Sequence, residues 1–387
     1  MKEFQFFLNT LIDFGCGKIK NLCNYIKEYN SKKVVIVTDK NLQDIGLIEP
    51  IIDELKKFNI QYSIFNRVEP NPEIHIIDEG ASFVKEDSCD MIIALGGGSS
   101  IDTAKGIALM AVNEGSVSDY LDGRGENKKK IVNKPLPLIA IPTTSGTGSE
   151  VSIYSVITDE NTRIKDSLTS PLLYPKAAIV DPQLTLKLPP RVTAHTGLDV
   201  LGHALEAYTS SIQNPLTNVW ALEAIKLVFE NLPKACNEGT KKSRENMAFA
   251  SVMAGSAMSH CGGTIPHGLG CPLSGHCDLP HGLTVGILQI PMIEYNKEVL
   301  KDKLYRVVKY INPNIEITEE NAADKLIEMI KDLFTKINVK EILDEKEINK
   351  ETIEAMIKDA EIHGCTGLNP LPLNYEDIKE IYEKIIK

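Results

Sequence analysis

The chain has 387 residues, which is enough for two domains that each bury a hydrophobic core. Hydrophobic residues make up 43% of it and charged residues 25%, proportions that are typical of globular proteins. Acidic residues outnumber basic ones by 53 to 42, and the net charge of −11 argues against binding to nucleic acid or to anionic membrane surfaces.

The N-terminal residues lack the long apolar core and the cleavage site of a signal peptide. No run in the sequence approaches the roughly 18 apolar residues that a membrane helix needs. The eight cysteines form no short-spaced framework and no Cys-x-x-Cys pair, which favours reduced thiols. We therefore expect a cytoplasmic protein.

The first half of the chain alternates short β-rich runs with helical patterns. Apolar runs typical of strands occupy 33–37 and 91–95, with a helical pattern at 51–58 and an extended run at 61–65 between them. Strands that alternate with helices predict an open parallel sheet covered by helices on both faces.

A glycine-rich turn follows the strand predicted at 91–95. Gly96, Gly97 and Gly98 precede Ser99 and the start of a helical pattern. Glycine allows close backbone approach, and the free amides of a helix N-terminus favour anions, so this turn suits a phosphate group. It departs from the Gly-x-Gly-x-x-Gly fingerprint because Ile101 holds the place of the third glycine, and such a turn alone is more often simply a turn.

A second loop, rich in threonine, serine and glycine, occupies 142–150 after a strand predicted at 136–141. Two such loops favour a nucleotide site, because ligands of open α/β sheets bind beyond the carboxyl ends of the strands. Asp39, just after the first predicted strand, would suit the two hydroxyls of a ribose and discourage a 2′-phosphate. An exposed turn residue is an equally good interpretation of Asp39.

The pattern changes near 183–190. From residue 193 onward, helical patterns dominate and strand-like runs become scarce. We expect an α/β domain at 1–185 and a helical domain at 186–387.

Histidines are concentrated in the second half: six of the eight lie between positions 195 and 281. Asp199 and His203 are four residues apart and would share one face of a helix. His267 and His281 each follow a proline and precede a glycine, which would let the backbone approach a bound group. One carboxylate and three imidazoles suit a divalent first-row metal ion better than Ca(II) or Mg(II). On local spacing alone, a metal site and a set of buried core histidines are equally good interpretations.

Six separated segments together resemble the iron-activated alcohol dehydrogenase family along nearly the whole chain. They are 96–105 (GGGSSIDTAK), 141–150 (IPTTSGTGSE), 178–182 (AIVDP), 197–208 (GLDVLGHALEAY), 266–268 (PHG) and 280–282 (PHG). The resemblance implies a Rossmann-like N-terminal α/β domain that binds NAD(P) and an all-helical C-terminal domain. It also implies an active site, with a divalent metal, in the cleft between them.

The same resemblance assigns residues to both ligands. The implied metal ligands are Asp199, His203, His267 and His281, with Fe(II) as the first choice of ion and Zn(II) as the second. The implied cofactor residues are Gly96, Gly97, Gly98 and Ser99 at the pyrophosphate, Thr143, Thr144 and Thr147 beside the adenine and nicotinamide, and Lys165 near the ribose. Asp39 matches the position where similar members select NAD, so we expect NAD, with NADP as the alternative.

One position departs from the family pattern. Cys271 stands where many relatives carry a histidine near the nicotinamide, four residues after the third metal ligand. We therefore predict that proton transfer takes place in the neighbourhood of Cys271 and His276. We hypothesise that His276 or His260 moves the proton, or that solvent does.

The expected activity is metal-assisted hydride transfer between NAD(P) and short primary alcohols, diols or their aldehydes. One alternative is a lyase or synthase of the dehydroquinate synthase type, which uses NAD transiently. Its anionic substrate would need many basic residues, yet the stretch 199–282 holds only five, none beside an implied ligand. The other alternative is a non-catalytic nucleotide-binding or metal-binding protein. Homo-oligomers are usual among similar proteins, and a dimer is the default on symmetry grounds.

Overall fold

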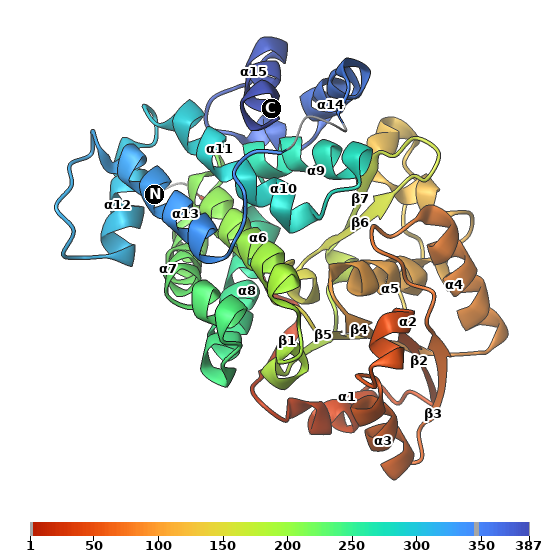
Figure 1. Ribbon diagram of the computed structural model, residues 1–387. Coiled ribbons are helices and arrows are strands. Elements are labelled where there is room, and N and C mark those ends of the chain that lie inside the picture. The colour runs from red at the N-terminus through yellow and green to blue at the C-terminus, as the bar shows by residue number, and fades with distance from the viewer. Residues whose placement is uncertain (1–2, 344–347, 387) are drawn as a thin grey trace. The chain divides into compact units, whose positions relative to one another are not determined.

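A computed structural model describes residues 3–343 and 348–386 (Figure 1). They form two compact units. The α/β unit comprises Phe7–Thr144 and Gly148–Lys187, and the helical unit comprises the described residues of Met1–Phe6, Ser145–Thr147 and Leu188–Lys387.

The α/β unit is built on a six-stranded sheet with the order β1-β8-β5-β4-β2-β3, in which every pair of neighbours is parallel. The strands are β1 (Leu11–Phe14), β2 (Lys33–Val37), β3 (Gln61–Phe65), β4 (Met91–Gly96), β5 (Leu138–Pro142) and β8 (Ala177–Val180). The predicted open parallel sheet is therefore confirmed. A separate antiparallel hairpin joins β6 (Tyr154–Thr158) to β7 (Lys165–Thr169).

Helices cover both faces of this sheet, as predicted (Figure 1). They are α1 (Leu22–Glu28), α3 (Glu49–Lys57), α4 (Ile74–Glu86) and α5 (Gly98–Met110), whereas the short α2 (Lys40–Asp44) has no buried residue. Successive strand residues point to opposite faces. In β2, Val35 packs in the core cluster of α4 and α5, whereas Ile36 packs in that of α1 and α3. The strands β2, β4, β5 and β8 are buried along nearly their whole length, which explains their apolar runs.

The helical unit contains ten α-helices within its described residues. They are α6 (Pro190–Thr209), α7 (Pro215–Asn237), α8 (Lys241–Cys261), α9 (Ile265–Cys277), α10 (His281–Ile287), α11 (Gln289–Asn296), α12 (Lys301–Ile311), α13 (Ala322–Lys336), α14 (Lys350–Ile362) and α15 (Tyr375–Ile385). The predicted helical character of the second half is confirmed. None of the described helices is both long enough and apolar enough to cross a membrane.

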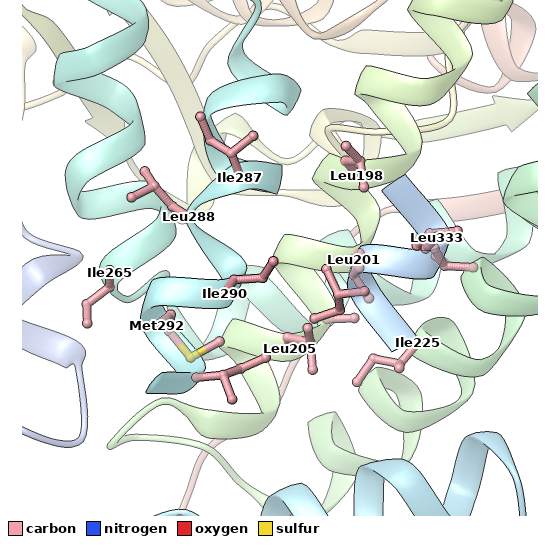
Figure 2. Packing of buried hydrophobic residues seen from close by; sticks show 14 of the residues in the cluster. Leu198, Leu201, Leu205, Ile225, Ile265, Ile287, Leu288, Ile290, Met292 and Leu333 are labelled. Atoms are coloured by element: carbon pink, nitrogen blue, oxygen red, sulfur yellow. The ribbon is translucent and has the colours of Figure 1, made fainter. Parts of the chain in front are cut away.

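Helix α6 lies at the centre of the helical unit and packs against α7, α8 and α10. Its residues from Gly197 to Thr209 are all buried. Leu198, Leu201 and Leu205 of this helix belong to a large cluster of buried hydrophobic residues. Figure 2 shows these three leucines among their neighbours in the cluster. A helix buried on all sides can hold polar groups only where they are paired or bind something.

Candidate metal centre and cofactor loops

Asp199 and His203 lie one turn apart on the buried part of α6. His203 Nε2 is 3.9 Å from Asp199 Oδ1, and the residues are 6% and 2% exposed. Burial lowers the pKa of His203, which keeps its ring in the neutral form that binds metals. The two side chains therefore present one oxygen and one nitrogen to the same point.

His267 and His281 approach the same carboxylate oxygen from two other helices. His267, in the first turn of α9, places Nε2 at 3.8 Å from Asp199 Oδ1. His281, the first residue of α10, places Nε2 at 3.7 Å from it and is the most exposed of the three histidines. The His203 and His267 rings are stacked with centroids 4.8 Å apart. Ligand atoms of Asp199, His203 and His267 thus all lie within 4.8 Å of one another, and His281 Nε2 approaches the same carboxylate oxygen from α10.

The donor set fits a small divalent ion. Within residues 3–343 and 348–386, Asp199 Oδ1 and His267 Nε2 are buried atoms without a hydrogen-bond partner, although such atoms are nearly always paired. In a tetrahedral first-row metal site with bonds of about 2.1 Å, ligand atoms stand about 3.4 Å apart. The 3.7–3.9 Å separations around Asp199 Oδ1 need only a small contraction to match.

The glycines that follow His267 and His281 serve helix packing. A Cβ on Gly282 would come inside 3.0 Å of the His195 carbonyl oxygen, and one on Gly268 inside 3.0 Å of Thr366 Oγ1. We predicted that these glycines let the backbone approach a bound group, but the atoms in close contact with them are protein atoms. Their absent side chains let α10 reach α6 and let α9 reach the segment after α14.

Glu206, three residues after His203 on α6, is a further site residue that no sequence motif predicted. Its carboxylate is fully buried, and Oε1 lies 2.6 Å from His267 Nδ1. Oε2 accepts hydrogen bonds from the backbone N–H of Thr264 at 2.5 Å and of His267 at 3.3 Å. Burial alone would raise the pKa of Glu206, but the His267 ring and these hydrogen bonds leave that pKa lowered. The available signal was its position on the face of α6 that carries Asp199 and His203.

Cys271, His276 and His260 are the residues considered for proton transfer, and the two histidines contact different residues. Cys271 is buried on α9, one turn after His267. His276 Nε2 lies 2.7 Å from Asp359 Oδ2 on α14, and the His260 ring stacks on Phe6 with centroids 4.2 Å apart. The role of His276 or His260 in proton transfer stays a prediction.

A further imidazole, that of His363, follows α14. The ring is half-buried but closely surrounded, and desolvation, with repulsion from His267, lowers the pKa of His363 to about 4. Its Nδ1 accepts a hydrogen bond from the Cys365 backbone at 3.3 Å. Position 363 carries no motif, so sequence patterns gave no reason to select it.

In the α/β unit, the glycine turn and the start of the second loop are in contact. Gly96 ends β4 with a φ of 148°, which favours glycine, and its carbonyl accepts a hydrogen bond from the Thr143 N–H at 2.9 Å. A Cβ on Gly97 would stand 3.2 Å from Thr144 Oγ1. Gly98 and Ser99 begin α5. Thr147, by contrast, belongs to the helical unit.

Asp39 and Lys165, the other expected cofactor residues, both make hydrogen bonds within the α/β unit. Asp39 is the N-cap of α2, and its Oδ1 accepts a hydrogen bond from the Leu42 N–H at 2.9 Å. Lys165 Nζ donates to Asn71 Oδ1 at 2.7 Å. Asp39 is thus a helix cap at the end of β2, which refines its interpretation as a turn residue.

A buried charged cluster ties α5 to the end of the second loop. Lys105 Nζ, fully enclosed, donates to Ser149 Oγ at 3.0 Å, and Ser149 Oγ donates to Asp102 Oδ1 at 2.5 Å. Burial lowers the pKa of Lys105 to about 8 and raises the pKa of the neighbouring Glu150 to about 7. These residues lie within the segments that carry the family resemblance, but only the structure shows that they form one network.

Known protein families and individual relatives match nearly the whole chain. A family model described as iron-containing alcohol dehydrogenase matches residues 9–182, and one for the C-terminal part of the Fe-containing alcohol dehydrogenase family matches residues 193–386. Choline dehydrogenase of Bacillus subtilis (strain 168) is 35% identical over 99% of this chain and 96% of its own. NAD-dependent methanol dehydrogenase of Bacillus methanolicus is 33% identical over 99% of this chain and 100% of its own.

The fold of the chain also matches that of solved alcohol dehydrogenase structures. The crystal structure of an archaeal halo-thermophilic alcohol dehydrogenase from a Red Sea brine pool is 34% identical, covers 99% of each chain and superimposes with a TM-score of 0.93. The chain therefore belongs to the iron-containing alcohol dehydrogenase family, and it is an oxidoreductase that acts on CH–OH groups.

Proposed function

We propose that this chain catalyses the metal-dependent, NAD(P)-linked oxidation of short primary alcohols or diols and the reduction of their aldehydes. The observation that carries the proposal is the buried Asp199 oxygen, which faces three imidazole nitrogens at 3.7–3.9 Å. A buried set of one carboxylate and three imidazoles has the chemistry of a catalytic metal site.

In the proposed site, Asp199, His203, His267 and His281 hold the divalent ion, Fe(II) in the first place and Zn(II) as the alternative. The ion supplies Lewis-acid chemistry at the oxygen of the alcohol or aldehyde. Asp199 provides the single negative charge of the four side chains, so the donor set neutralises only part of the ion's charge. The low exposure of Asp199, His203 and His267 keeps water away and strengthens electrostatic interactions.

The substrate is proposed to be small and uncharged. Among the described residues, the ion pairs of Asp199 and Glu206 involve histidines and no lysine or arginine. The buried Arg244 is bonded instead to Thr193 Oγ1 and the Leu188 carbonyl. A lyase of the dehydroquinate synthase type would need basic groups for its anionic substrate, so these contacts favour an alcohol or aldehyde.

The cofactor is proposed to be NAD, bound by a domain that spans 1–185, whereas the metal-binding domain spans 186–387. The turn from Gly96 to Ser99 receives the pyrophosphate at the N-terminus of α5, where free backbone amides favour anions. Thr143, Thr144 and Thr147 line the adenine and nicotinamide, Lys165 approaches the ribose, and Asp39 disfavours the 2′-phosphate of NADP.

Proton transfer is proposed to involve His276, in the neighbourhood of Cys271. The partner of His276 is Asp359, whose Oδ2 lies 2.7 Å from His276 Nε2. The His276→Ala variant tests this role through the pH dependence of turnover. An unchanged pH profile would reject it.

The chain is further proposed to act in the cytoplasm as a homodimer, with small alcohols or aldehydes as its partners. Light scattering of the purified protein tests the dimer. A molar mass near that of one 42.8 kDa chain would contradict it.

The activity is tested by loading metal-free protein with Fe(II) or Zn(II) and following NADH absorbance at 340 nm. With short aldehydes, the absorbance should fall, and with short alcohols and NAD it should rise. No change across such a panel, with metal and cofactor both shown to be bound, would favour a non-catalytic protein. Conversion of an anionic substrate without net change in NADH would favour the lyase.

A further inference from the structure

Glu206 links the proposed metal site to the start of a second helix. Its Oε1 lies 2.6 Å from His267 Nδ1, while the other ring nitrogen of His267 faces Asp199 Oδ1 at 3.8 Å. We propose that Glu206 is a positioning residue that fixes the tautomer and the orientation of His267 for metal binding. This inference rests on the proposed metal site.

The tautomer follows from hydrogen-bond chemistry. An ionised carboxylate only accepts hydrogen bonds, so His267 must carry its proton on Nδ1 to bond with Glu206. A neutral ring protonated on Nδ1 has its lone pair on Nε2, the nitrogen that faces Asp199. Carboxylates in this position raise the basicity of a metal-binding histidine and hold its ring in place.

Glu206 also replaces the missing cap of α9. Thr264 is the N-cap residue of that helix, but its side chain accepts no capping hydrogen bond. Glu206 Oε2 instead accepts from the backbone N–H groups of Thr264 and His267. These amides belong to the N-terminal end of α9, where a negative charge is favourable.

Both carboxylate oxygens of Glu206 therefore bond to His267. One oxygen holds the backbone of α9 at Thr264 and His267, and the other holds the imidazole that projects from that backbone. Because Glu206 lies on α6 with Asp199 and His203, it fixes the distance between the two helices that supply three of the four proposed ligands.

The test compares Glu206→Gln with Asn214→Ala. Glutamine keeps the size of the side chain but replaces one acceptor oxygen with an NH₂ group, so it cannot accept from both His267 Nδ1 and the Thr264 amide. Asn214 caps α7 in the same unit through bonds to the amides of Leu216 and Thr217, so its alanine variant loses a buried helix cap whose hydrogen bonds do not involve Glu206 or His267.

The readout is the dissociation constant of Zn(II), measured by chelator competition on metal-free protein. We expect Glu206→Gln to bind Zn(II) about 10–100-fold more weakly than the unmodified chain, and Asn214→Ala to bind it equally well. Equal affinity of Glu206→Gln and the unmodified chain would overturn the inference and leave the proposed function intact. An equal loss in Asn214→Ala would overturn it too, because general destabilisation would then explain both. If the unmodified chain bound no metal, the proposed function and the inference would fail together.

A measurement on the unmodified protein covers the case in which Glu206→Gln does not fold. In the Zn(II)-loaded protein with ¹⁵N-labelled histidine, the ring of His267 should show a protonated Nδ1, hydrogen-bonded to a carboxylate. A His267 ring that is protonated on Nε2 would overturn the inference.

Discussion

Gly282 packs directly against the backbone carbonyl of His195, so closely that a Cβ at position 282 would come inside 3.0 Å of that oxygen. The contact brings the first turn of α10 onto α6. It places His281, the preceding residue, 3.7 Å from Asp199 Oδ1. Helix packing at a glycine thus determines where the fourth proposed ligand lies.

Gly282→Ala should therefore weaken metal binding and destabilise the helical unit. The added methyl group must push α10 away from α6, and overpacking of this kind costs about 1–3 kcal/mol. Metal content after loading and the free energy of unfolding in urea measure the two effects. Gly367→Ala is the matched control, because a Cβ at Gly367 meets nothing within 4 Å. If Gly282→Ala bound metal as tightly as the control, the account of α10 would be wrong.

Asp39→Asn should shift cofactor preference toward NADP. Asparagine still accepts the hydrogen bond from Leu42 that caps α2, but it removes the negative charge that would repel a 2′-phosphate. We expect the ratio of kcat/KM for NADP to that for NAD to rise about tenfold, which corresponds to about 1.4 kcal/mol.

Asp44→Asn provides the control for that shift, because Asp44 is an exposed acidic residue at the end of the same helix. Its substitution should leave the ratio unchanged. An equal rise in both variants would mean that general charge, and not the position of Asp39, sets the preference.

Glu150→Gln should change how stability depends on pH. Burial raises the pKa of Glu150 from 4.5 to about 7, so the folded chain holds this proton more tightly than the unfolded chain does. The contribution of Glu150 to stability is therefore greatest below pH 4.5, falls as the pH rises to about 7 and is constant above that. The loss amounts to about 3 kcal/mol, since one pKa unit corresponds to about 1.4 kcal/mol.

The measurement is the difference in unfolding free energy between the unmodified chain and Glu150→Gln, at pH 5 and at pH 8. Titrating groups that do not interact with Glu150 are present in both proteins and cancel. The unmodified chain should lose stability relative to the variant between these two values. A difference that does not change with pH would contradict the buried state of Glu150.

Much of the fold followed from local patterns, and the exceptions have physical causes. The strands β2, β3 and β4 were predictable because each is an extended, mostly apolar run. β1 and β8 have only four residues each, too few for a period to be recognised. α9 contains three glycines and Pro272, which disfavour a helix in isolation. It forms because Glu206 caps it and because Gly268 packs against Thr366.

Some site residues were likewise predictable from local patterns, and others were not. Asp199 and His203 were recognisable from their spacing on one helix, whereas His267 and His281 were selected among the other histidines by family resemblance. Glu206 contacts His267 across 61 residues of sequence, and no local pattern reports such a contact. Lys105 and Asp102 lay inside a recognised segment, but their network with Ser149 depends on how α5 packs against a distant loop.

The most direct test of the central claim is a metal and activity titration of the unmodified chain and of Asp199→Asn. The unmodified chain, freed of metal and reloaded with Fe(II) under anaerobic conditions, should bind about one ion per chain and form NADH from short alcohols in proportion to bound metal. Asp199→Asn, folded according to its near-UV circular dichroism, should bind no ion tightly and show no turnover. Full activity in metal-free protein, or retained metal and activity in Asp199→Asn, would contradict the proposed metal centre.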